Sequence, residues 1–357
     1  MLVSTPWRPQ LSRLYRLLLV ALVCAICLAH TPYPLSSIAA LASTTLSLHR
    51  LSLRQPRSSA STASRARALN ASKLALLIEN RPLPVLAPLL LHFVAVLPPD
   101  WRFLFLGSDA SLALLNASAP VRRRLGSGKL TLAPIPLNTS TAGPEMVSRF
   151  LTDPWLYRVA AAPARWLLIF QTDSMLCANS RFHVDSFLAY DWVGAPWVPD
   201  GHWGGNGGLS LRRVEPILDV LHNQVRANDS EPEDVWLAER LAHRPGANSA
   251  NGSVALTFSG EMNSGVAETV VANATLDTAT LDASPVSYLV HGIDDWRHGF
   301  YEPMGYHTGG SGVWLHSAVW GTPQLRRHIW DYCPEVKMTL AMDFARYVPG
   351  SCNSRWP

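Results

Sequence analysis

Short apolar runs alternate with longer amphipathic segments from Lys73 to Phe170, and this alternation constrains the fold more than any other feature. Apolar runs of strand length and periodic segments of helical length predict β and α elements in turn. The expected strands are 73–78, 101–106, 130–135 and 166–170, and the expected helices are 84–96, 111–125 and 145–156. Such a chain is expected to form an α/β domain whose mostly parallel sheet is flanked by helices on both faces. Ligands of these sheets bind beyond the carboxyl ends of the strands.

The N-terminus has the charge asymmetry of a type II signal anchor. Arg8, Arg13 and Arg16 precede the apolar run 17–29, and no Lys, Arg, Asp or Glu follows until Arg50. We therefore expect a cytosolic tail at 1–16, a single membrane-spanning segment at 17–42, and a luminal domain in the Golgi or the endoplasmic reticulum. The uninterrupted run is shorter than the roughly 20 residues that span a bilayer. A cleaved signal peptide ending near 40–42, or a transit peptide, remains an alternative.

Composition divides the rest of the chain. Residues 43–72, rich in Ser, Ala, Thr and Arg, predict a flexible stem, and one folded domain is expected at 73–348, followed by a tail at 349–357. Within the domain, residues 243–285 are dominated by Asn, Ser, Gly, Ala and Thr, which is typical of a mobile or disordered surface insertion.

Charge, cysteines and sequons narrow the class of protein. The net charge of +4 comes largely from the N-terminus, which lacks acids before Glu79, so it does not indicate a nucleic-acid partner. Cys24 and Cys27 lie in the apolar segment, and the pairing we favour among the other cysteines is Cys333 with Cys352. Asn-x-Ser/Thr sequons, compatible with a luminal glycoprotein, begin at Asn70, Asn116, Asn138, Asn228, Asn251 and Asn273.

The apolar strand 166–170 ends directly in Gln171, Thr172, Asp173 and Ser174. A carboxylate in this place faces the ligand-binding edge of the sheet, where it could hold a Mg²⁺ or Mn²⁺ ion that bridges phosphate oxygens. The alternative is that Asp173 only caps the following helix or loop.

Glycines gather in the next motif, where Gly204, Gly205, Gly207 and Gly208 surround Asn206. Glycine lets the backbone approach a ligand closely. The motif is not a P-loop, since no Lys-Ser/Thr follows it, and a plain hairpin is the alternative. The neighbouring Trp197 and Trp203 are candidates for stacking on a sugar.

Two further segments supply candidate reactive groups. Glu233 and Asp234 lie at the start of an amphipathic helix that runs to Leu241. One of these carboxylates can act as a general base. The alternative is that they only complement the helix dipole, as acids in a first turn often do. His307 ends the aromatic segment 300–307 and is a candidate metal ligand, although a single His is more often structural.

These phrases together carry a resemblance to a known family. LLIFQTDSMLC at 167–177, YDWVGAPW at 190–197, GGNGGLSLRR at 204–213, EDVWLAERL at 233–241 and EPMGYH at 302–307 resemble fungal and algal proteins that share a domain of unknown function and are considered glycosyltransferase-like. ALLIENRPLP and LPPDWRF match the opening of that family. The resemblance runs in order from Lys73 to His307, interrupted by the insertion.

The resemblance implies a GT-A-type, Rossmann-like fold with a single catalytic domain. It implies that Asp173 stands at the metal-binding Asp motif and that His307 also ligates the metal. It implies that residues 204–210 form the loop that binds donor and acceptor. It also implies that Asp234, with Glu233, supplies the general base of an inverting transferase. Gln171 departs from the pattern, because the family of folds usually has a second Asp there. Metal binding could then be weaker, shared with His307, or absent.

The leading hypothesis is a transferase that moves a sugar from a nucleotide-diphosphate donor to a hydroxyl of a glycan or glycoprotein, with Mn²⁺ or Mg²⁺. A non-catalytic glycan-binding or scaffold protein on a degenerate fold is the alternative. A glycoside hydrolase, which needs two carboxylates about 5–10 Å apart, is a third hypothesis.

Overall fold

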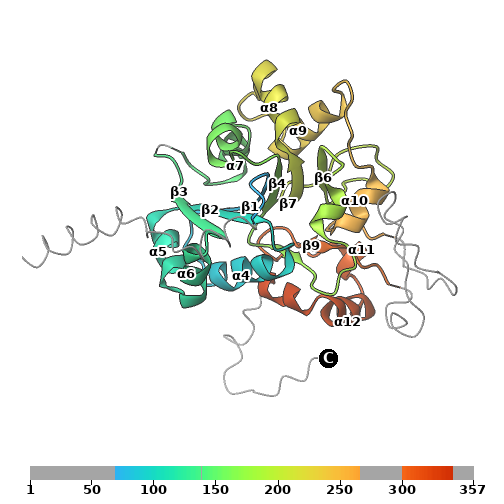
Figure 1. Ribbon diagram of the computed structural model, residues 1–357. Helices are drawn as coiled ribbons and strands as arrows, with labels where there is room; N and C mark the ends of the chain where they lie inside the picture. The colour runs from blue at the N-terminus through green and yellow to red at the C-terminus, as the bar shows by residue number, and fades with distance from the viewer. Residues whose placement is uncertain (1–68, 138, 266–299, 341–357) are drawn as a thin grey trace, which may run out of the picture. The chain divides into compact units, whose positions relative to one another are not determined.

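The computed structural model describes residues 69–137, 139–265 and 300–340 (Figure 1). The predicted cytosolic tail, the predicted membrane span and the C-terminal tail lie outside these residues, as does nearly all of the predicted stem. Among the described residues, no helix has both the length and the apolar character needed to cross a membrane.

A six-stranded sheet forms the centre of the fold, with the strand order β3-β2-β1-β4-β7-β6. The strands from β3 to β4 in this order are parallel, whereas β7 runs antiparallel to both of its neighbours. The prediction of a mostly parallel sheet flanked by helices is therefore confirmed. The strands are β1 (Lys73–Glu79), β2 (Arg102–Gly107), β3 (Leu130–Pro134), β4 (Trp166–Phe170), β6 (Trp192–Gly194) and β7 (Leu209–Arg213).

Each strand sends alternate side chains to opposite faces, and both faces are covered. On one face, Ala75 and Leu77 of β1 pack into a core with α4, α5, α6, α10 and α12. On the other face, Leu74 and Leu76 pack into a second core with α7, α8 and α9. Figure 1 shows these two groups of helices on either side of the sheet. The helices are α4 (Leu86–Val96), α5 (Asp109–Ala117), α6 (Ala119–Gly126), α7 (Pro144–Leu151), α8 (Val214–Asn223), α9 (Glu233–Ala242), α10 (Gly252–Phe258), α11 (Ser317–Trp320) and α12 (Pro323–Tyr332).

Short helical turns complete these layers. A π-helical turn at Leu156–Ala160 follows α7, so the helix predicted over 145–156 is shorter than expected. The 3₁₀ turns are Val184–Phe187 and Pro334–Thr339. The single helix predicted over 111–125 is instead the pair α5 and α6. Ser118 between them is extended, because Pro120 suits the first turn of a new helix but not the interior of a continuing one.

A second, three-stranded sheet has the order β5-β9-β8 and extends the ligand-binding edge. Its strands are β5 (Ser174–Leu176), β8 (Ser259–Gly260) and β9 (Gly305–His307). The prediction of a disordered insertion at 243–285 is wrong for 243–265, which contains α10 and β8. Ala255 and Phe258 are fully buried, so this segment is held by the core despite its polar composition. Residues 266–285 lie outside the described residues.

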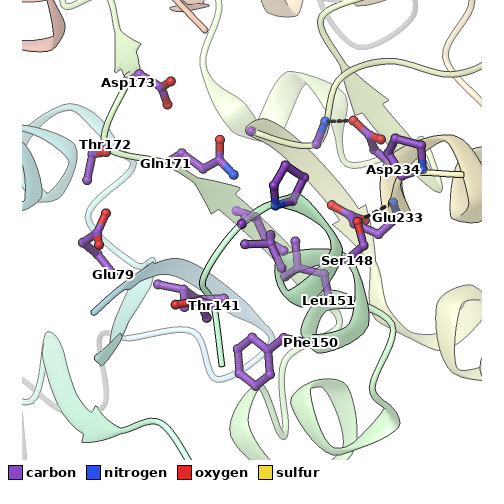
Figure 2. Close-up of a pocket in the computed structure, with 18 of the residues that line it drawn as sticks. Glu79, Thr141, Ser148, Phe150, Leu151, Gln171, Thr172, Asp173, Glu233 and Asp234 are labelled. Carbon is purple, nitrogen blue, oxygen red and sulfur yellow. Dashed lines mark hydrogen bonds between the residues drawn. The ribbon is translucent and has the colours of Figure 1, made fainter. Parts of the chain in front are cut away.

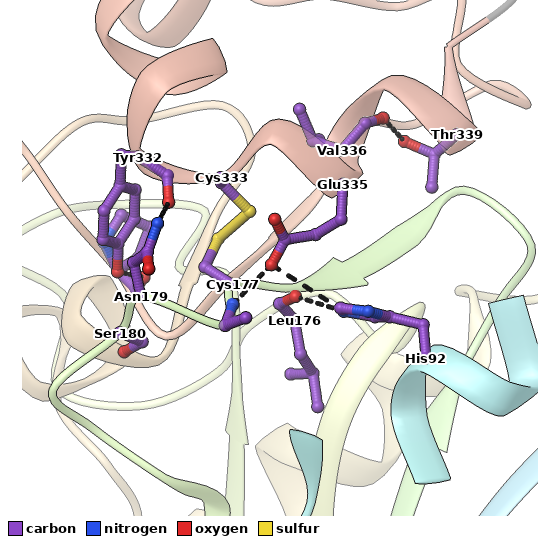
Figure 3. Close-up of a disulfide and its surroundings, with 12 residues drawn as sticks. His92, Leu176, Cys177, Asn179, Ser180, Tyr332, Cys333, Glu335, Val336 and Thr339 are labelled. Carbon is purple, nitrogen blue, oxygen red and sulfur yellow. Dashed lines mark hydrogen bonds and ion pairs between the residues drawn. A yellow bond between two sulfur atoms is a disulfide. The ribbon is translucent and has the colours of Figure 1, made fainter. Parts of the chain in front are cut away.

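A disulfide joins Cys177, just after β5, to Cys333, at the end of α12 (Figure 3). The predicted pairing of Cys333 with Cys352 is therefore wrong, because the fold brings β5 beside the C-terminal segment. Further contacts fix the same junction: the backbone N–H of Ala178 donates to the Glu335 carboxylate, and the Asn179 amide donates to the Tyr332 carbonyl at 2.8 Å. The end of α12 and the 3₁₀ turn after it are thus bound to the chain just after β5, the strand that follows Asp173.

Candidate functional site

A cavity of about 780 Å³ opens at the carboxyl ends of β1 and β4, where the sheet topology predicts ligand binding (Figure 2). It brings together many of the candidates predicted from sequence. Those that line it are Gln171, Thr172, Asp173, Asn206, Gly207, Gly208, Glu233, Asp234 and His307. Residues 78–81 and the segment 139–144 line the other part of the cavity.

Antiparallel pairing places the glycine motif beside the strand that ends in Asp173. Phe170 at the end of β4 pairs with Leu209 at the start of β7, and the Gln171 N–H donates to the Gly208 carbonyl at 2.9 Å. A Cβ on Gly208 would lie 2.3 Å from His307 Nε2 and 2.8 Å from Gln171 Oε1. Glycine at 208 therefore leaves room for two side chains of the site.

The small sheet brings His307 next to Asp173. β5 and β9 pair so that Ser174 lies opposite His307, and His307 Nε2 is 3.3 Å from Asp173 Oδ1. Burial disfavours the Asp173 carboxylate, but His307 and the N–H of Ser311 outweigh burial and lower the pKa of Asp173.

Glu261 holds the other side of the His307 ring. β8 runs parallel to β9, and Glu261, which follows β8, places Oε1 at 3.0 Å from His307 Nδ1 and accepts from the Asn206 amide at 3.3 Å. Burial lowers the pKa of His307, but the two carboxylates, Asp173 and Glu261, overcome it and raise that pKa to about 10. Glu261 is a site residue that the sequence analysis missed, because it lies in the segment predicted to be mobile.

The donors around His307 fit a hard divalent cation. Across the described ranges, no three side chains drawn from His, Cys, Asp and Glu gather as a metal site. The third donor beside Asp173 and His307 is an amide oxygen: Gln171 Oε1 lies 3.3 Å from His307 Nε2. Carboxylate, neutral imidazole and amide oxygen are suitable ligands for Mn²⁺ or Mg²⁺, so a cation bound here would displace the proton that the raised pKa keeps on His307. A carboxylate on the second ring nitrogen, as Glu261 provides, is the usual partner of a metal-ligating His.

Asp234 lies across the cavity, on the first turn of α9 (Figure 2). Its Oδ2 accepts the N–H of Gly207 at 2.9 Å, and its Oδ1 accepts the N–H of Val235. These donors orient the carboxylate and leave lone pairs for a ligand hydroxyl. Asp234 therefore has the placement of a general base.

Glu233 has a different environment, because its carboxylate pairs with the fully buried Arg212 at 2.9 and 3.2 Å. Burial raises the pKa of Glu233 to about 7, against the opposing effect of Arg212. The same guanidinium donates to the Gly207 carbonyl and to Ser210, and lies 4.3 Å from the Trp192 ring centre. Arg212, which the sequence analysis did not single out, thus joins β7, the glycine motif and α9.

The remaining candidates do not line the cavity. Ser174 is buried and donates to the Gly208 carbonyl, and Gly205 packs against the backbone of Gly194. Gly204 packs against the Trp197 ring, and Trp203 lies edge-on to His243. Ser174, Trp197 and Gly194 therefore contact the glycine motif outside the cavity.

Polar groups at the end of β1 were also missed. Glu79 holds Arg81 through both carboxylate oxygens at 2.9 and 2.7 Å, and the Asn80 amide donates to Thr141 at 2.8 Å. The rule that drew attention to Asp173, a polar side chain just after a buried strand, applies equally to Glu79 and Asn80.

Part of the chain matches the model of a protein family of unknown function. Residues 129–274 match the family model described as "Protein of unknown function (DUF5672)", which confirms the resemblance to a domain of unknown function over that part of the chain, while the fungal and algal origin stays a prediction. No curated protein matches.

Solved structures with a similar arrangement include three glycosyltransferases. A mannosyltransferase from Pyrobaculum calidifontis, in complex with GDP-Man and Mn²⁺, is 11% identical with a TM-score of 0.32, over 49% of this chain and 56% of that one. The mannosyltransferase Ktr4p from S. cerevisiae is 7% identical with a TM-score of 0.26, over 36% and 41%. The bifunctional WbbM is 7% identical with a TM-score of 0.37, over 76% and 52%. The chain thus spans about half the length of these proteins, and no residue role is transferred from them.

Proposed function

We propose that the chain is a glycosyltransferase of the GT-A type that moves a sugar from a nucleotide-diphosphate donor to a hydroxyl of a glycan or glycoprotein. The observation that carries the proposal is the cavity at the carboxyl ends of β1 and β4, with Asp173, His307 and the backbone of Gly208 on one side and Asp234 with the backbone of Gly207 on the other. The sequence resemblance from Lys73 to His307 supports the same reaction class.

In the proposed reaction, an acceptor hydroxyl oxygen bonds to the anomeric carbon of the donor as the bond from that carbon to the diphosphate oxygen breaks. The electron pair leaves with the diphosphate, and the hydroxyl proton passes to the Asp234 carboxylate. Attack in line with the leaving group inverts the configuration. Proton transfer to a positioned carboxylate contributes about 10²–10⁴ in rate.

Asp234 is a better base than Glu233, because Arg212 occupies both oxygens of Glu233. We assign Glu233 a positioning role: it anchors the start of α9 so that Asp234 meets the Gly207 N–H.

Asp173, His307 and Gln171 would hold a divalent cation, which supplies charge neutralisation of the departing diphosphate when bound. Arg81, whose side chain is 58% exposed, also lines the cavity, but its charge is balanced by the Glu79 carboxylate that holds it. The amide in place of a second carboxylate lowers the negative charge of the proposed metal site.

We further propose that this domain works in the lumen of the secretory pathway, behind the predicted N-terminal anchor. The disulfide between Cys177 and Cys333 supports an oxidising compartment, where such bonds persist. Exposed sequon asparagines at 116, 228 and 251 are also compatible with glycosylation.

The proposal is tested by incubating the full chain with a panel of nucleotide sugars, with and without Mn²⁺, and measuring nucleoside diphosphate release. We expect slow release from one donor, with Asp234→Asn reducing it about 100-fold while donor binding is kept. Asp219→Asn, on the exposed surface of α8, is the control.

Two results would contradict this assignment. Failure of every donor to bind would remove the proposed function. Binding of a donor and a glycan with no turnover would favour the non-catalytic glycan-binding protein.

A further inference from the structure

The segment that follows β9 forms an unusual turn at the wall of the cavity. We call Thr308–Leu315 the rim loop. Gly309, Gly310, Ser311 and Gly312 all have positive φ, of 68°, 51°, 60° and 82°. Glycine adopts this left-handed backbone without steric cost, which explains its repetition here. Ser311 lines the cavity.

The rim loop is fixed at both ends. The N–H and the hydroxyl of Thr308 donate to the Asp173 carbonyl at 2.9 and 3.0 Å, and the Ser311 N–H donates to Asp173 Oδ2 at 2.9 Å. At the other end, a Cβ on Gly312 would lie 1.9 Å from the Thr339 carbonyl oxygen. The loop is therefore tied to the candidate metal-binding Asp and to the C-terminal 3₁₀ turn.

This loop exposes three consecutive apolar side chains. Val313, Trp314 and Leu315 are 63, 68 and 39% exposed. A Cβ on Gly310 would lie 2.8 Å from Cδ2 of the Trp314 ring, so the indole rests on the Gly310 backbone, next to Ser311. One part of the ring is supported by the loop while most of it remains open to solvent, and Ser311, three residues before it, lines the cavity.

The rim loop follows the wall of the cavity, so the ligand that would contact the Trp314 ring is one that extends out of the cavity. The proposed donor would occupy the cavity of about 780 Å³, whereas a glycan acceptor would extend out of it, past the rim loop. A supported, open indole suits the apolar C–H face of a pyranose ring, since aromatic side chains bind through large flat contact areas.

We propose that Trp314 and the rim loop form a binding subsite for the acceptor, a glycan whose sugar ring stacks on the indole. The assignment of this glycan as acceptor rests on the proposed function. It moves the aromatic contact for sugar from Trp197 and Trp203, which are half-buried, to Trp314, which is 68% exposed.

The test measures three kinds of binding by the full chain: to oligosaccharides, to nucleoside diphosphates and to phosphatidylcholine vesicles. Binding to an array of defined oligosaccharides reports the rim loop, and calorimetry with uridine and guanosine diphosphate reports the nucleotide part of the cavity. The variants are Trp314→Ala, Trp314→Phe, which keeps an aromatic ring, and Val225→Ala, a control at a site that is 90% exposed.

We expect the wild type to bind at least one oligosaccharide, Trp314→Ala to weaken this binding about tenfold, and Trp314→Phe to retain most of it. Nucleotide binding should be unchanged in Trp314→Ala. If the wild type binds oligosaccharide through Trp314 but no nucleoside diphosphate, the glycan subsite stands and the proposed transferase function fails.

Three results would overturn the subsite. These are a wild type that binds no oligosaccharide, a Trp314→Ala variant that binds as the wild type does, and a Trp314→Ala variant that loses binding to phosphatidylcholine vesicles but not to oligosaccharides. The last result would make the rim loop a lipid contact.

Discussion

Replacing Arg212 by Met tests the buried ion pair beneath the cavity. Arg212 is fully buried and Glu233 is 5% exposed, so the variant leaves a buried carboxylate without its cation. Breaking a buried pair by removing one partner costs about 3–5 kcal/mol, a large fraction of the roughly 5–15 kcal/mol stability of a typical domain. The variant also removes donors to the Gly207 carbonyl and Ser210.

The assay is equilibrium unfolding in urea at about pH 8, above the Glu233 pKa of about 7, where the carboxylate is ionised in the folded wild type. Arg244→Met is the matched control, because Arg244 and its partner Asp219 are both partly exposed, at 25 and 55%, so the variant leaves no buried carboxylate unpaired. A pair of this kind contributes about 0–1 kcal/mol.

The loss in Arg212→Met should be smaller at about pH 5, where Glu233 is protonated. The double variant Arg212→Met/Glu233→Met should be more stable than Arg212→Met, because it contains no unpaired carboxylate. The reasoning is refuted if Arg212→Met unfolds at the same urea concentration as Arg244→Met at the higher pH.

Three further predictions concern the surrounding structure. Glu261→Gln should weaken Mn²⁺ binding about 10–100-fold in calorimetry and shift the His307 ring nitrogen resonances; unchanged affinity and resonances would exclude the positioning role of Glu261. Peptide mapping without reductant should recover Cys177 linked to Cys333, and Cys177→Ser should lower the unfolding free energy by about 2–4 kcal/mol; a Cys333 peptide linked elsewhere would contradict the fold. The raised pKa of Glu233 means that the folded state holds more protons than the unfolded state between pH 4.5 and about 7, so its contribution to stability is lost as pH rises through that window. Glu233→Gln should flatten this part of the pH dependence, and an equally steep profile would argue against it.

The four parallel strands and the helix over 84–96 could be predicted because their signal is local. The apolar run 166–170 and the polar residues after it identify β4 and Asp173 without knowledge of any neighbour. The helix break at Ser118 was also local, yet the apolar periodicity over 111–125 hid the effect of Pro120.

Pairings between distant segments could not be read from the chain. Nothing near Cys177 indicates that the fold carries Cys333 to it, and the polar composition around Glu261 concealed a segment whose Ala255 and Phe258 are buried. The role of Arg212 depends on Glu233, which α9 brings beneath the cavity, so its burial follows from tertiary structure alone.

Calorimetric titration of the full chain with nucleotide sugars and their nucleoside diphosphates, in the presence of Mn²⁺, tests the central claim most directly. We predict saturable binding of one nucleotide and its sugar conjugate, greatly weakened in Asp173→Asn and in Gly208→Val, whose side chain would fill the space of His307 and Gln171. Variants that remain folded and bind the nucleotide as the wild type does, or a wild type that binds none, would contradict the assignment of this cavity to a nucleotide-sugar donor.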